Sequence, residues 1–170
     1  RLVGLHFFVP AHIMKLLEII RGDASAPTAL ASGFRLAKQL GKIPVVAGLC
    51  DGFIGNRILA RYREAADLLL LHGATSAQID EAMTGFGYAM GPYEAQDMSG
   101  LDIAFANRRR QDASRDPNRT YVHIADKMVE AGRLGRKTGL GWYSYANDGK
   151  AATDPLVDAL IVAEAVHAGI

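Results

Sequence analysis

The sequence predicts a mainly helical fold that is preceded by a short α/β segment. Two near-continuous apolar runs, residues 2–8 (LVGLHFF) and 15–20 (KLLEII), open the chain. Such runs are typical of strands that are covered on both faces, although their length also fits short helices. A helical pattern over residues 27–40 and a third apolar run over residues 43–47 follow. The order strand, strand, helix, strand is that of the closing part of a doubly wound sheet.

Helical patterns dominate after Gly52. Residues 53–71 carry apolar side chains at helical spacing, which predicts one face turned toward a core. The residues on that predicted face are Ile54, Ile58, Tyr62, Ala65 and Leu69.

The later helices are predicted from their ends. Thr75 and Gln78 match a capping box, and Gly91-Pro92 is typical of a stop followed by a new helix start. The sequence predicts helices over residues 79–86, from 92 to about 109, over 121–131 and from 155 to about 167, with an extended piece over 142–145.

Composition and charge exclude several classes of partner. The chain has 19 basic and 18 acidic residues and a net charge of +1, so no global field favours nucleic acid or an anionic membrane surface. No apolar run approaches the ~20 residues that span a membrane.

The single cysteine, Cys50, rules out an intrachain disulfide and favours a reducing compartment, here the cytoplasm. Cys50 is expected to be a small buried residue, and a zinc site is not expected.

His6 and Glu18 stand out because each places one ionisable side chain inside an apolar run. Taken singly, His6 could be a core histidine whose two ring nitrogens both have hydrogen-bond partners. Glu18 could be a carboxylate on an edge strand that points to solvent. If the two strands are neighbours, however, the side chains can meet. A buried carboxylate fixes the tautomer of an adjacent imidazole and favours its protonated form, which suits a general base.

Asn56 lies in the string GFIGNR, which opens the helical part of the chain. Gly52 and Gly55 allow close approach by a ligand or by another backbone segment. The Asn56 amide offers both a donor and an acceptor to a substrate. A bond to its own helical turn explains the residue equally well.

Four strings, taken together and in this order, resemble the 3-hydroxyacyl-CoA dehydrogenase family. They are GLHFFVPAHIMKLLEII, the stretch from AKQLGKIPVVAGLCDGFIGNR to GATSAQID, GYAMGPYEAQDMSGLDIA and GRLGRKTGLGWYSY, and the resemblance runs from Leu2 to about Tyr145. It implies a helical C-terminal dehydrogenase domain preceded by the last strands and helix of a Rossmann-like NAD-binding domain. The expected segments are 1–50 for the α/β remnant, 51–147 for the helical domain and 148–170 for a tail helix or linker.

The resemblance also implies roles for individual residues. His6 corresponds to the catalytic base, Glu18 to its orienting partner and Asn56 to a residue that aligns the substrate. The implied reaction oxidises (S)-3-hydroxyacyl-CoA to 3-oxoacyl-CoA with NAD in fatty-acid β-oxidation. Val9 departs from the family pattern, which usually has Asn or Ser before the proline, and this puts a polar contact near the nicotinamide in doubt.

The cofactor-binding residues cannot be assigned, because the 170 residues contain no G-x-G-x-x-G turn. The isolated chain is therefore expected to be inactive. The tail resembles the stretch that leads to a second helical domain in multifunctional fatty-acid oxidation proteins. A homo-oligomer, or packing against such a domain, is expected. Two alternatives stay open: a two-domain dehydrogenase for another hydroxy acid, and a helical assembly module whose catalytic residues are idle.

Overall fold

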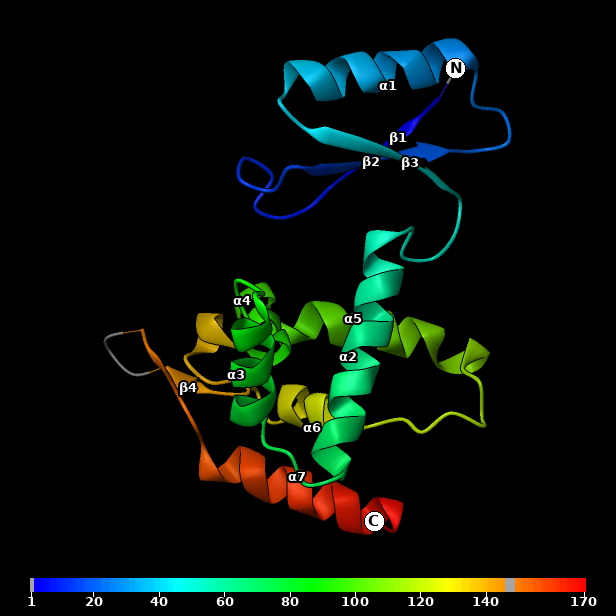
Figure 1. The fold of residues 1–170 in the computed structure, drawn as a ribbon. Coiled ribbons are helices and arrows are strands. Elements are labelled where there is room, and N and C mark those ends of the chain that lie inside the picture. The colour runs from blue at the N-terminus through cyan, green and yellow to red at the C-terminus, as the bar shows by residue number, and fades with distance from the viewer. Residues whose placement is uncertain (1, 146–148) are drawn as a thin grey trace. The chain divides into compact units, whose positions relative to one another are not determined.

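Three strands, one helix and the first turns of a second helix form the N-terminal unit of the computed structural model, which describes residues 2–145 and 149–170. The strands are β1 (Gly4–Phe7), β2 (Leu16–Arg21) and β3 (Ile43–Gly48), and helix α1 (Pro27–Gln39) connects β2 to β3. Strand β2 lies in the middle of the sheet, antiparallel to β1 and parallel to β3. The predicted order strand, strand, helix, strand is confirmed (Figure 1).

Small residues let α1 approach the sheet closely. Gly33 and Ala37 are the buried residues of this helix, and a Cβ on Gly33 would lie 3.1 Å from Cγ2 of Ile19 and 3.6 Å from Cδ2 of Leu5. Leu5 and Ile19 are register partners across β1 and β2. Because side chains alternate along a strand, the residues next to them, His6 and Glu18, face away from α1.

A second unit begins at Arg63 and is almost entirely helical. This confirms the mainly helical class that the sequence predicts. Its elements are the end of α2 (Gly55–Leu71), α3 (Ser76–Phe86), α4 (Pro92–Ser99), α5 (Leu101–Gln111), α6 (Ile124–Glu130) and α7 (Pro155–Ala168), two short 3₁₀ turns (Asp112–Ser114 and Arg136–Thr138) and the paired strands β4 (Ser144–Tyr145) and β5 (Ala151–Ala152).

Several helix ends follow the sequence signals, whereas the helix predicted over 121–131 begins only at Ile124. The Thr75 side chain accepts from the main-chain N–H of Gln78, whose own side chain accepts from the N–H of Thr75, so the capping box is confirmed. The single helix predicted from 92 to about 109 is wrong, because Gly100 adopts a φ of 91° and separates α4 from α5. A glycine with a positive φ interrupts the helical hydrogen bonding at that point.

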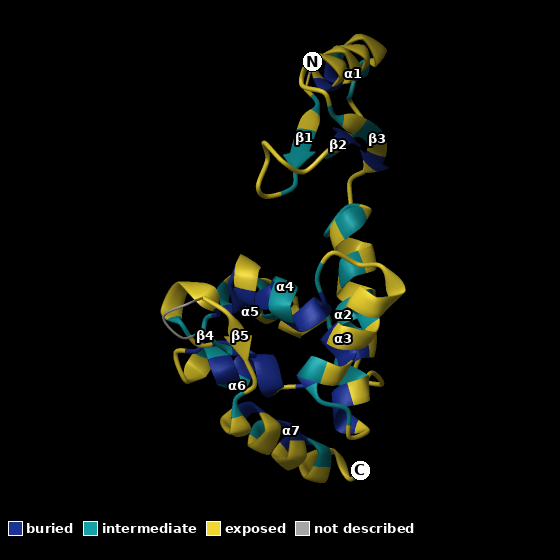
Figure 2. Ribbon diagram, turned by 60° about the vertical axis from the view of Figure 1, so that its left-hand side comes forward, coloured by how far each residue is buried: buried dark blue, intermediate teal, exposed yellow. Residues whose placement is uncertain are grey.

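The predicted apolar face of α2 is also wrong. Ile54, Ile58 and Leu69 are exposed, whereas Ala66 and Leu70 are buried, so the buried face is displaced by one residue from the predicted stripe. The core of the helical unit gathers where its helices meet (Figure 2). It contains Leu70, Leu71, Ile79, Tyr93, Leu101, Ile124, Met128, Trp142, Val157 and Ile161.

The C-terminal helix belongs to this core. Val157 and Ile161 of α7 are buried in the same cluster as Trp142, and the Asp154 side chain caps the helix by accepting from the N–H of Leu156 at 3.0 Å. Helix α7, which lies in the segment predicted as a tail helix or linker, therefore supplies packing to the helical unit. Within the described residues, no helix is long and apolar enough to cross a membrane.

Buried carboxylates hold the loops of the helical unit by their main-chain N–H groups. Asp97 accepts from the N–H groups of Trp142 and Tyr143, both at 2.9 Å. A Cβ on Gly141 would lie 2.0 Å from Oδ1 of Asp97, and one on Gly135 would lie 2.3 Å from the Asp97 carbonyl oxygen. Gly135 and Gly141 thus permit close packing on Asp97.

We therefore predict that Gly141→Ala destabilises the helical unit by roughly 3–5 kcal/mol, because it displaces a buried carboxylate from two main-chain donors. Gly85→Ala is the matched control. Gly85 is exposed within α3 and has open space around its Cα. Alanine there should therefore raise the free energy of unfolding by at most about 1 kcal/mol, through its higher helix propensity. Thermal melts followed by circular dichroism compare the two variants, and equal midpoints would contradict this account of Gly141.

Candidate active site around His6 and Glu18

The sheet register brings His6 and Glu18 together. The two residues are direct partners across the antiparallel pair β1–β2, and opposite residues in such a pair place their Cβ atoms about 4.5–5.5 Å apart on the same face. Nδ1 of His6 lies 2.6 Å from Oε2 of Glu18. The Glu18 side chain is fully buried, whereas 27% of the His6 side chain is exposed. The expected meeting of the two side chains therefore occurs.

The other oxygen of Glu18 binds the start of α2. Oε1 accepts from the main-chain N–H of Ile54 at 2.9 Å and from that of Gly55 at 2.7 Å. The first N–H groups of a helix have no partner within the helix, so they are available to an anion. One carboxylate thus connects β2, the imidazole on β1 and the segment that opens α2.

These contacts keep Glu18 charged despite its burial. Burial alone would raise the pKa of the Glu18 carboxyl, but the bond from His6 and the N–H groups of Gly55 and Ile54 outweigh it. The pKa therefore lies below its ordinary value of 4.5. Because Glu18 is ionised near neutral pH, the shared hydrogen resides on Nδ1 of His6. When the ring is neutral, the lone pair of Nε2 can accept a proton from a bound molecule.

Two aromatic rings pack against the imidazole of His6. The ring centroid of Phe8 lies 4.8 Å from that of His6, and the ring centroid of Phe53 lies 5.3 Å from it. Sequence patterns did not indicate these rings or the two N–H groups that hold Glu18. A signal for the N–H groups was present, because Gly52 and Gly55 mark a helix start where free donors are expected.

Asn56 directly follows Gly55, whose main-chain N–H donates to Glu18. It is exposed in the first turn of α2, so the hairpin β1–β2 and the start of α2 bring all three predicted site residues into the N-terminal unit. The structure pairs His6 with Glu18 directly. Asn56 is connected to the pair through the backbone of Gly55, its neighbour in the chain.

The expectation that Cys50 is buried is wrong. Cys50 is exposed, because it falls in the turn that follows β3 and not within the strand. Its Sγ lies 3.6 Å from a guanidinium nitrogen of Arg57. Among the described residues, no cluster of His, Cys, Asp or Glu could hold a metal ion.

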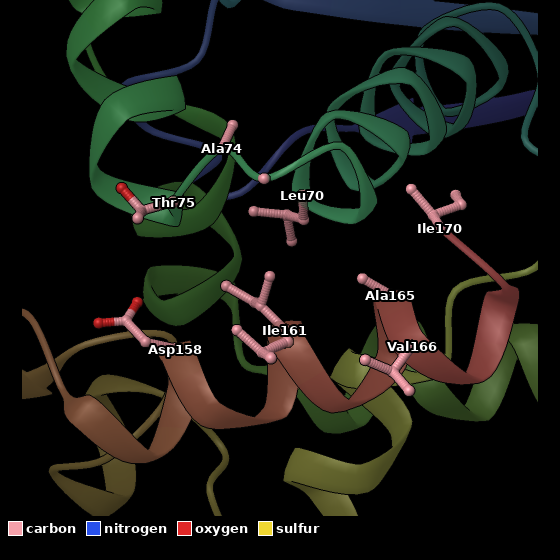
Figure 3. A pocket seen from close by; sticks show the side chains of 10 residues that line it. Leu70, Ala74, Thr75, Asp158, Ile161, Ala165, Val166 and Ile170 are labelled. Carbon is pink, nitrogen blue, oxygen red and sulfur yellow. The ribbon is translucent and has the colours of Figure 1, made fainter.

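The helical unit has an apolar pocket that lacks comparable chemistry. Its volume is about 230 Å³, and its walls come from the end of α2, the turn before α3 and the helix α7 (Figure 3). Leu70, Ile161, Ala165, Val166 and Ile170 line it, and Asp158 is the single ionisable side chain of the lining. A polar hollow of about 560 Å³ at the ends of β2 and β3 is lined by Arg21, Asp23 and Ser25, among others. Neither hollow is lined by His6 or Glu18.

Comparison with known proteins identifies the family. Residues 1–50 match the model of the NAD binding domain of 3-hydroxyacyl-CoA dehydrogenase, and residues 52–145 match that of its C-terminal domain. The peroxisomal bifunctional enzyme of Danio rerio is 43% identical over 171 residues, which cover 93% of this chain and 24% of that protein. The fatty acid oxidation complex subunit alpha of Psychrobacter arcticus is 40% identical, with 92% of this chain and 22% of that protein covered.

A solved structure shows the same fold. The (S)-3-hydroxybutyryl-CoA dehydrogenase from Ralstonia eutropha superposes with a TM-score of 0.74 at 39% identity, covering 85% of this chain and 52% of that one. The chain thus spans about a quarter of the length of the curated relatives and about half of the solved enzyme. From the two family matches, the chain belongs to the 3-hydroxyacyl-CoA dehydrogenase family, with residues 1–50 in its NAD-binding domain and residues 52–145 in its C-terminal domain.

Proposed function

We propose that the protein containing this chain oxidises (S)-3-hydroxyacyl-CoA to 3-oxoacyl-CoA with NAD, as a step of fatty-acid β-oxidation. The observation that carries the proposal is the 2.6 Å contact between Nδ1 of His6 and Oε2 of Glu18. It leaves a partly exposed imidazole with Nε2 free beside a buried, charged carboxylate. That arrangement suits the removal of a proton from an alcohol.

In this mechanism each residue has a separate task. Nε2 of His6 accepts the proton of the C3 hydroxyl group, and the charge of Glu18 stabilises the imidazolium that forms. The bond to Glu18 also holds the ring in the tautomer that exposes Nε2. Asn56 aligns the substrate near its reacting oxygen through its amide, for which its exposed position at the start of α2 leaves room.

The described residues fit the proton-accepting end of such a site better than a phosphate cradle. The glycines in the tightest surroundings, Gly91, Gly135 and Gly141, face the carboxyl groups or backbone of Asp80 and Asp97, which would repel a pyrophosphate. NAD, when bound, supplies the hydride acceptor. The chain's own contribution is the base and its orientation.

The relatives bear on the wider protein. Those found are called a bifunctional enzyme and a subunit of a fatty acid oxidation complex, which supports a multifunctional parent. An assembly role with idle residues would be favoured by a Glu18 turned away from His6, and Glu18 instead binds it. A cytoplasmic location stays a prediction, because the relatives include peroxisomal proteins. The segment boundaries also stay predictions, and so does homo-oligomerisation or packing against a second helical domain.

The full-length protein carrying His6→Gln tests the proposal. We expect kcat with a 3-hydroxyacyl-CoA to fall by ~10²–10⁴ while KM changes little, because the base acts in the transition state. His167→Gln, at an exposed position in α7, is the control and should behave as wild type. Near-normal turnover by His6→Gln would refute the assignment, and faster oxidation of free hydroxy acids would favour a different dehydrogenase.

Glu18→Gln should lower activity and move the acid limb of the pH–rate profile to lower pH. A glutamine has one oxygen, so it cannot accept both from Nδ1 of His6 and from the N–H groups of Ile54 and Gly55. The interaction with His6 helps to lower the pKa of the Glu18 carboxyl, and Glu18→Gln removes this attraction between carboxylate and imidazolium, so inactivation by acid then requires a lower pH.

Profiles measured on the full-length enzyme check this direction. Glu130→Gln makes the same chemical change at an exposed site in α6 and should leave the limb in place. An acid limb that stays put or moves upward in Glu18→Gln would count against the pair.

A further inference from the structure

Phe53 has a backbone conformation that its residue type disfavours. Its φ of 45° is the single positive φ of a non-glycine residue among the described residues. Side chains with a Cβ rarely adopt this conformation, which glycine adopts without steric cost. If the turn alone mattered, glycine would serve it better. The side chain of Phe53 therefore has a reason of its own to be there.

The turn around Phe53 is fixed from both sides. The N–H of Phe53 donates to the carbonyl of Cys50 at 3.2 Å, and the N–H of Arg57 donates to the carbonyl of Gly52 at 3.2 Å. Immediately after Phe53, the N–H groups of Ile54 and Gly55 hold Oε1 of Glu18. The conformation of Phe53 is thus set by the same segment that anchors the carboxylate.

That conformation directs the Phe53 ring onto His6. The two ring centroids lie 5.3 Å apart with an interplanar angle of 52°, and Phe8 contacts the same imidazole at 4.8 Å. Glu18 fixes one atom of the imidazole, Nδ1, but a single hydrogen bond leaves the ring free to tilt about it. Contacts with the two phenyl rings restrict that tilt and so determine where Nε2 points.

We propose that Phe53 is a positioning residue for the general base, holding the His6 imidazole at the tilt that aims Nε2 at the substrate. The inference rests on the proposed function of His6. Misplacement of a catalytic group by about 1 Å can cost up to ~10²-fold in rate. Loss of the ring should therefore lower kcat, whereas the Glu18 contacts, which use main-chain atoms of residues 54 and 55, should persist.

Phe53→Gly in the full-length enzyme tests the proposal, because glycine favours the observed φ and should keep the turn folded. We expect kcat to fall about 10-fold or more at little-changed KM, with the acid limb of the pH profile unmoved. Phe53→Leu restores apolar bulk and should lie closer to wild type. Phe86→Leu, a change at an 81% exposed ring, is the control.

The same change in a His6→Gln background separates positioning from a general structural effect. If Phe53 acts through His6, Phe53→Gly should alter the residual rate by less than about twofold there. An equal loss in both backgrounds, or full kcat in Phe53→Gly alone, would overturn the inference while leaving the role of His6 intact. Near-normal turnover by His6→Gln itself would overturn both proposals.

Discussion

The site depends on one buried carboxylate that is shared between two strands and a helix. Glu18 is fully buried, and its oxygens bind Nδ1 of His6 on one side and the N–H groups of Ile54 and Gly55 on the other. An unpaired charge at that depth would be costly. The three donors make it stable, and the same three bonds set the imidazole tautomer and fix how α2 begins beside the sheet.

The helical unit uses carboxylates in a similar way but with a different electrostatic result. Asp97 accepts from Trp142 and Tyr143, and Asp80 accepts from the N–H of Tyr93 at 2.9 Å. Burial dominates at both aspartates and raises the pKa of each, despite these bonds. At Glu18 the donors prevail and the pKa is lowered. The charged carboxylate beside His6 contacts a partly exposed imidazole and so suits catalysis, whereas the two aspartates bind main-chain N–H groups and hold the fold together.

Local patterns predicted most of the elements because each has its own chemical signal. The three apolar runs, the capping box at Thr75 and the Asp154 cap depend on neighbouring residues alone. The break at Gly100, the buried face of α2 and the exposure of Cys50 depend on tertiary packing or turn geometry, which periodicity does not report. His6 and Glu18 could be singled out as ionisable residues in apolar runs, but their contact required a register that the sequence leaves open. The contact of Phe53 with His6 depends on a left-handed φ that no sequence pattern indicates.

In this structure Glu18 holds neutral His6 with its hydrogen on Nδ1 and its lone pair on Nε2. Nitrogen-15 NMR of the full-length protein labelled at histidine reports the tautomer directly, at a pH where the ring is neutral. We expect neutral His6 to be protonated at Nδ1, and we expect Glu18→Gln to lose this preference. A neutral ring protonated at Nε2 in the wild-type protein would contradict this expectation.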